Sequence, residues 1–243
     1  MLRTSALLPV ALALTPLLAQ AANAVCEAQT GDKLTPVIEL YTSEGCSSCP
    51  PADQWLSGLK GKPVVAQAFH VAYWDYIGWK DVYASPAFTT RQRDIAAANR
   101  LSNIYTPQVV RNGQDWRTWR LPLQTLDSKA PAKAHIALRK AEGSDQFEAR
   151  VTPARGTGPW TAYWTVTEHN HSSRVKAGEN AGEFLKHDFV VRQYVTLGHY
   201  DGAQVLKIGA IAAKPEHPRQ INVVVTDAKS GESLQAISLQ CAS

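Results

Sequence analysis

The sequence predicts two domains, an α/β domain over residues 25–130 and a mostly antiparallel, β-sandwich-like domain over residues 131–243. Two observations favour this fold class. The first half alternates apolar, strand-like segments with helical patterns, as α/β domains do. The second half carries short alternating segments separated by turn residues, with little helical periodicity, which is typical of antiparallel sandwiches.

In the first half we expect a strand, a helix, a strand, a helix and a strand in that order. The helix after Cys49 follows from apolar side chains on one face, and the next strand from a near-continuous apolar run. Ser85 is the expected N-cap of the second helix, and Pro86 is its expected first residue. The expected elements cover residues 36–41, 51–59, 64–71, 86–99 and 108–111.

In the second half, period-two alternation predicts strands bounded by glycine, proline and polar turn residues. No internal repeat or long low-complexity linker separates the two halves, so we expect the domains to pack closely. The expected strands cover residues 135–139, 147–152, 160–167, 190–197, 220–226 and 234–239.

Residues 1–24 predict a secretory signal peptide. Arg3 precedes an apolar run, and the segment ends in the small residues Ala22, Asn23 and Ala24. Two prolines interrupt the run, which is shorter than the roughly 20 apolar residues of a membrane-spanning helix. We therefore expect a periplasmic or secreted mature chain with no membrane span after cleavage.

The charge balance excludes some classes of partner. The chain has 25 Lys and Arg against 21 Asp and Glu, a formal net charge of +4. So small an excess argues against a nucleic-acid partner. The sequence contains no Gly-rich phosphate loop, nucleophile elbow or pair of metal-binding histidines on a helix. No cofactor is expected.

The four cysteines fall into two groups. Cys26 follows the signal segment and Cys241 lies near the C-terminus, whereas Cys46 and Cys49 are separated by two residues. In an oxidising compartment the outer two are interpreted as a structural disulfide. The alternative is a pair of unbridged thiols.

The inner pair has the spacing of a redox-active centre. A helix that starts at the pair stabilises a thiolate on Cys46 through its dipole and free N–H groups, which makes Cys46 the candidate nucleophile. Cys49 can then attack a mixed disulfide and release the partner. Half of a zinc site, or a plain structural disulfide, has the same spacing.

Three segments around this pair resemble the thioredoxin superfamily, and more closely a secreted bacterial thioredoxin-like family of unknown function. They are residues 39–53 with the Cys46-Ser47-Ser48-Cys49 pair, residues 69–81 and residues 105–108. Weaker similarity extends to residues 178–182 and 187–191. The resemblance implies an α/β thioredoxin-like first domain.

The resemblance also implies roles for individual residues. Pro107 would be a cis proline whose loop lies against Cys46 and Cys49, which places it in the catalytic set. Thr106 would offer backbone hydrogen bonds to an extended peptide substrate. One departure is the buried acid expected at the position of Leu40, because the acid here is Glu39, which strand alternation turns to the opposite face.

Two further candidates lie after the second expected strand. His70 could join Cys46 and Cys49 in a soft Cu(I) site, although a buried core histidine is the alternative. The aromatic segment that contains Trp74 and Tyr76 could form an apolar lip that binds substrate, or could simply pack.

Together these features predict a periplasmic or secreted thiol–disulfide oxidoreductase. Its partners would be protein thiols or disulfides in the cell envelope. A Cu(I)-handling protein, a non-catalytic peptide- or protein-binding module and a structural protein with a permanently oxidised pair remain alternatives. The direction of electron flow does not follow from the sequence.

Overall fold

The computed structural model describes residues 26–120 and 126–241, which are mostly β-strand. The expected signal peptide, residues 1–24, lies outside the described residues. The helices of the described part are short: α1 (Pro50–Ser57), the 3-10 helix η1 (Ala72–Ile77) and α2 (Pro86–Ala98). Within these same ranges, no helix is both long enough and apolar enough to cross a membrane.

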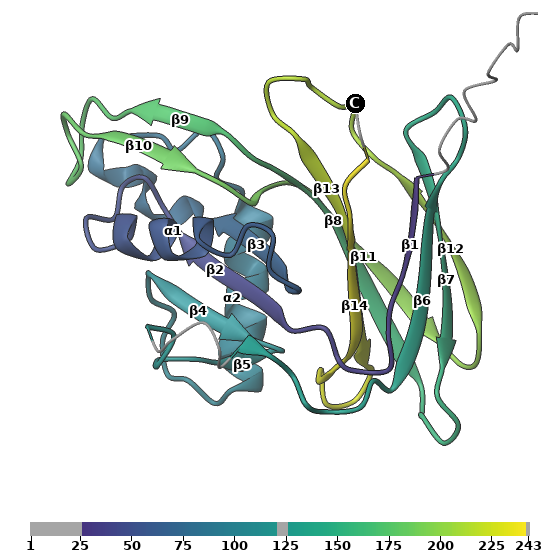
Figure 1. Cartoon of the computed structure of the whole chain (residues 1–243). Helices are drawn as coiled ribbons and strands as arrows, with labels where there is room; N and C mark the ends of the chain where they lie inside the picture. Colours follow the sequence, from purple (N-terminus) through teal and green to yellow (C-terminus); the bar gives the residue numbers. More distant parts are fainter. Residues whose placement is uncertain (1–25, 121–125, 242–243) are drawn as a thin grey trace, which may run out of the picture.

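A single sheet of eight strands forms the centre of the molecule, in the order β14-β13-β8-β11-β3-β2-β4-β5 (Figure 1). β2 and β3 are parallel and fully buried, and the other long pairings are antiparallel. The strands are β2 (Val37–Thr42), β3 (Val65–His70), β4 (Gln108–Arg111), β5 (Gln114–Asp115), β8 (Trp160–Glu168), β11 (Val190–Tyr200), β13 (Arg219–Asp227) and β14 (Ser233–Leu239).

Strand β11 joins the two halves of the chain into this sheet. Its first residue, Val190, pairs in parallel with Ala68 of β3, and the Ala68 N–H donates to the Phe189 carbonyl at 2.7 Å. The rest of β11 runs antiparallel to β8, with two register shifts that bend it away from β3. The sheet therefore takes strands from both sides of residue 130.

This shared sheet corrects the predicted fold class. We expected an α/β thioredoxin-like domain followed by a separate β-sandwich-like domain, but the described chain is mostly β with short helices, and one sheet spans both halves. Each strand and helix that we expected is present within a few residues of its expected bounds. Their pairing was wrong because strand periodicity reports which face is buried and not which strand lies alongside.

A second sheet packs on the β8, β13 and β14 end of the first (Figure 1). The core between them contains Ile136, Leu138, Trp160 and Val223, all fully buried. The second sheet has the order β1-β6-β7-β12, from β1 (Glu27–Gln29), β6 (Ala134–Lys140), β7 (Gln146–Pro153) and β12 (Gln204–Gly209).

At the opposite end of the eight-stranded sheet, the two α-helices cover opposite faces. Ile38 and Leu40 of β2 pack with Leu56 of α1, whereas Tyr41 and Phe88 share a cluster on the α2 side. A two-stranded hairpin of β9 (His171–Arg174) and β10 (Phe184–His187) lies beside α1 (Figure 1). This hairpin and α1 frame the cysteine pair.

Candidate functional site

The cysteine pair lies in the turn between β2 and α1. The Ser43 carbonyl accepts from the Cys46 N–H at 3.1 Å, and the Ser43 hydroxyl accepts from the Gly45 N–H at 3.1 Å. Gly45 is required for close packing, because a Cβ at this position would lie 3.0 Å from the Trp74 Cβ. The backbone of the turn is therefore in close contact with η1.

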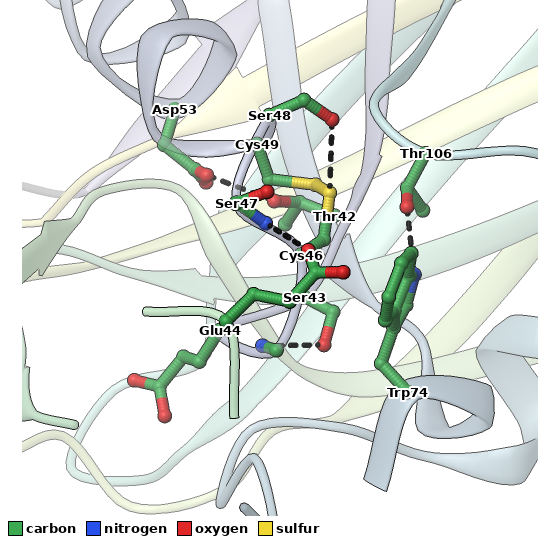
Figure 2. The surroundings of a disulfide bond; sticks show 12 residues. Thr42, Ser43, Glu44, Cys46, Ser47, Ser48, Cys49, Asp53, Trp74 and Thr106 are labelled. Carbon is green, nitrogen blue, oxygen red and sulfur yellow. Dashed lines mark hydrogen bonds between the residues drawn. A yellow bond between two sulfur atoms is a disulfide. The ribbon is translucent and has the colours of Figure 1, made fainter. Parts of the chain in front are cut away.

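Cys46 and Cys49 form a disulfide at the start of α1 (Figure 2). The Ser48 hydroxyl lies 3.4 Å from the Cys46 sulfur. The expected free N–H groups are fewer than the helix pattern suggested, because Pro50 and Pro51 have none. The helix dipole and the Ser48 hydroxyl are therefore the groups available to a Cys46 thiolate.

The pair is enclosed by the rest of the molecule. Cys46 is 1% and Cys49 0% exposed, while Ser47 and Ser48 between them face solvent. Each cysteine is next to one of these exposed serines in the chain, so the exposed part of the turn lies between the two buried sulfurs.

The connection between β9 and β10, residues 175–183, is bonded to the cysteine turn. The Asn180 side-chain amide donates to the carbonyls of Cys46 at 3.0 Å and Glu44 at 2.8 Å. The Glu179 carboxylate accepts from the Ser47 N–H at 2.9 Å, and this bond lowers the pKa of Glu179. The sequence similarity at residues 178–182 falls on this contact, although its purpose was not evident from the sequence.

The residues expected around Pro107 are near the turn. The Thr106–Pro107 peptide bond is cis, as expected. The Trp74 indole N–H donates to the Thr106 hydroxyl at 2.8 Å, so these two predicted substrate-binding residues contact each other (Figure 2). Tyr76 is 82% exposed. Trp74 is therefore held by packing and a hydrogen bond, while Tyr76 is free to meet a partner.

Glu39 lies on the face of β2 opposite the cysteine-bearing helix, as strand alternation predicted. Its carboxylate accepts from Arg91 at 2.5 and 3.0 Å and from the hydroxyls of Tyr41 and Tyr163 at 2.7 and 2.8 Å. Burial raises the pKa of Glu39, but Arg91 and the two hydroxyls outweigh burial and lower it. The Glu39 carboxylate is therefore bonded to Arg91, Tyr41 and Tyr163, on the face of β2 away from α1.

His70 is bonded to an aspartate. Its Nδ1 lies 2.7 Å from the Asp81 carboxylate, and both side chains are fully buried. Burial raises the pKa of Asp81, but His70 and the N–H groups of Glu44 and Tyr83 lower it overall. The ligand-type group that includes His70 in the described residues contains neither cysteine. The alternative Cu(I) site of Cys46, Cys49 and His70 therefore has no geometric support.

Sequence reasoning missed the buried acid–base pairs beneath the turn. His187 Nε2 lies 3.2 Å from Glu44, and its Nδ1 lies 3.7 Å from Asp53. Burial lowers the pKa of His187, but the two carboxylates outweigh burial and raise it to about 10. Glu44 and His187 are far apart in sequence, so only the pairing of β11 with β3 brings the two segments together.

The outer cysteines form the expected disulfide between Cys26 and Cys241. The two disulfides and the lack of a spanning helix in residues 26–120 and 126–241 are compatible with a secreted protein.

Comparisons with known proteins identify a family. The family model described as "Protein of unknown function (DUF1223)" matches residues 37–226. The structure titled protein AGR_C_4864 from Agrobacterium tumefaciens is 27% identical, with a TM-score of 0.69 over 86% of this chain and 96% of that one. HBP35 of Porphyromonas gingivalis is 12% identical, with a TM-score of 0.62 over 86% and 75%, and shares the fold alone. No protein of curated function matches.

These findings correct the family inferred from the sequence. The matched family is DUF1223, and the described part of this chain is mostly β-strand with short helices. The assignment to a thioredoxin-like family was therefore wrong. The segments that suggested it are local to the cysteine turn and its neighbours, whereas the fold depends on pairings across the whole chain.

Proposed function

The chain belongs to the DUF1223 family, and from that premise we propose that it is a thiol–disulfide oxidoreductase that acts through Cys46 and Cys49. The observation that carries the proposal is the geometry of the pair. A disulfide of C-x-x-C spacing begins a helix, and the Ser48 hydroxyl lies 3.4 Å from the Cys46 sulfur. A hydroxyl and a helix dipole both stabilise the thiolate that exchange chemistry requires.

The exchange starts at the Cys46 sulfur. A substrate thiolate attacks it, an S–S bond forms between substrate and Cys46, and the Cys46–Cys49 bond breaks with Cys49 leaving as a thiolate. A second substrate thiolate then attacks the substrate sulfur of the mixed disulfide and releases the Cys46 thiolate. Overall, two substrate thiols become a disulfide and the Cys46–Cys49 disulfide becomes two thiols: the pair gains two electrons, and the two protons that the substrate thiols release to water are taken up by the Cys46 and Cys49 thiolates. The reverse sequence reduces a substrate disulfide.

The substrates we propose are protein thiols or disulfides in the periplasm. The Cys26–Cys241 bridge and the apolar leader of the sequence support an oxidising compartment beyond the cytoplasmic membrane. The exposed Ser47 and Ser48 and the exposed Tyr76 ring lie on segments that meet at Gly45. An extended substrate strand would approach the pair there.

The test is exchange with a reduced or oxidised model protein, together with the reduction potential of the pair. Cys46→Ser should abolish exchange, and Cys49→Ser should accumulate a mixed disulfide through Cys46. The matched control is the double variant Cys26→Ser and Cys241→Ser, which should exchange normally. A potential below about −300 mV, with no mixed disulfide in Cys49→Ser, would make the pair structural and overturn the proposal.

A further inference from the structure

A second group of chemically active side chains lies beneath the cysteine turn. Asp53 of α1, His70 at the end of β3 and His187 at the end of β10 each offer a ligand atom, and these atoms lie within 4.8 Å of one another. The three residues are 7%, 0% and 3% exposed. Elements from distant parts of the chain thus converge on one buried point.

Both histidines point an unpaired nitrogen into the interior. Among the described residues neither His70 Nε2 nor His187 Nδ1 has a hydrogen-bond partner, and the acid that faces His187 Nδ1 is Asp53, whose Oδ1 lies 3.7 Å away. A buried polar atom without a partner is uncommon in folded proteins, and a bound ion is one of the explanations for it. Two such atoms in one group, beside a carboxylate, point to a cation.

The other nitrogen of each ring is held by a carboxylate. Asp81 lies 2.7 Å from His70 Nδ1, and Glu44 lies 3.2 Å from His187 Nε2. Metal-binding histidines have this arrangement, in which an outer carboxylate fixes the ring and makes the inner nitrogen a better ligand. The Thr42 hydroxyl orients Asp53 in the same way, donating to its Oδ2 at 2.8 Å.

The distances and charges suit a divalent transition metal. His187 Nδ1 and Asp53 Oδ1 are 3.7 Å apart, close to the ligand separation of about 3.4 Å that zinc bonds of about 2.0–2.2 Å produce in a tetrahedron. Three carboxylates surround the point, those of Glu44, Asp53 and Asp81, and no ion pair of the described residues joins any of them to Lys or Arg.

We propose that Asp53, His70 and His187 bind one divalent first-row transition metal ion. Imidazole nitrogens and a carboxylate are the ligand set that zinc and ferrous iron accept, with at least one coordination position left for water. A bound metal ion would connect α1, β3 and β10 through one ligand from each of these elements. The site is independent of the exchange reaction, since neither cysteine contributes a ligand.

The test uses the full chain with both disulfides formed and Zn²⁺ as the probe. Calorimetry and metal analysis after dialysis should give one zinc per chain and a rise in melting temperature with zinc. Asp53→Asn and His187→Gln should abolish this binding, and Asp81→Asn should weaken it about 10- to 100-fold. The matched control is His135→Gln, an exposed histidine of β6, which should bind zinc as the wild type does.

Two further measurements test the proposal even if a variant of one of these buried residues fails to fold. Wild-type protein loaded with Co²⁺ should show visible d–d bands without thiolate-to-cobalt charge transfer. The folded double variant Cys46→Ser and Cys49→Ser should keep its zinc. Absence of zinc binding by the wild type, thiolate charge transfer with Co²⁺, or loss of zinc in the cysteine variant alone would overturn the proposal.

Discussion

At the scale of the residue, the buried ion pair of Glu39 and Arg91 connects the central sheet to α2. Arg91 donates twice to Glu39, and its guanidinium stacks over the Tyr163 ring at 4.1 Å. The ion pair links β2, which carries Glu39, to α2, which carries Arg91. The Tyr163 hydroxyl of β8 donates to the same Glu39 carboxylate. A single side chain thus connects segments from both halves of the chain.

We expect Glu39→Gln to lower the free energy of unfolding at pH 7 by about 3–5 kcal/mol, because Arg91 would remain buried without its counter-charge. The folded-state pKa of Glu39 is lowered, so its stabilisation is complete above the unfolded pKa of about 4.3 and is lost as pH falls through the folded pKa. Urea unfolding across acidic pH should therefore show a flatter pH dependence in Glu39→Gln than in wild type.

The control for this titration is Glu142→Gln, an exposed glutamate in the turn after β6, which should leave both stability and its pH dependence unchanged. Parallel curves for wild type and Glu39→Gln below pH 4.3 would mean that another group dominates the acid transition.

At the scale of the element, the β9–β10 connection is hydrogen-bonded to the turn that carries the cysteine pair. Cys46 is only 1% exposed. We therefore expect a reductant to reach its sulfur after a local opening of the structure, and not on the surface of the closed molecule. Asn180, which is 5% exposed, donates two hydrogen bonds to this turn. We therefore expect these bonds to oppose a local opening at the pair.

We expect Asn180→Ala to accelerate reduction of the Cys46–Cys49 disulfide by dithiothreitol about 5- to 30-fold. Two lost hydrogen bonds of about 1 kcal/mol each raise the open population by that order. The rate is followed by alkylation of released thiols and mass spectrometry. Glu183→Gln is the matched control, since it lies on the same connection with an exposed side chain. An unchanged rate in Asn180→Ala would show that attack does not require this connection to move.

Local elements were predictable because their signals are local. The Ser85-Pro86 start of α2 is confirmed, with the Ser85 hydroxyl accepting from the Ala87 N–H, and so are the strands around residues 65–70 and 160–168. Short or polar strands such as β9 and β10 were missed, because four residues of mixed polarity carry too little periodicity.

At the scale of the whole molecule, the sequence could not specify which strands share a sheet. Val190 and Ala68 meet only because β11 enters the central sheet beside β3, a pairing between segments that are distant in sequence. The same pairing brings His187 close to Glu44 and Asp53. The buried group of these three side chains therefore could not be predicted from the sequence either. The position of the cysteine pair before a helix, by contrast, was predictable because it depends on four consecutive residues and the helical pattern that follows them.

The Cys26–Cys241 bridge fastens both ends of the described chain to one core. Both cysteines pack against the cluster between the two sheets, and Cys26 precedes β1 while Cys241 follows β14. The bridged positions are 215 residues apart, so the closed loop restricts almost the whole unfolded chain. The inner disulfide joins cysteines with a sequence separation of 3, so it restricts very little of the unfolded chain.

This contrast gives the last prediction. For the outer bridge the chain-entropy model gives about 5 kcal/mol, and for the inner bridge about 2 kcal/mol. The double variant Cys26→Ser and Cys241→Ser should therefore lose about 3–5 kcal/mol of unfolding free energy in denaturant titrations and show a larger m-value, because its unfolded chain is free to expand. The matched variant Cys46→Ser and Cys49→Ser should lose less and keep the wild-type m-value. Equal losses in the two variants would mean that native-state packing around the sulfurs, rather than restriction of the unfolded chain, determines what each bridge contributes.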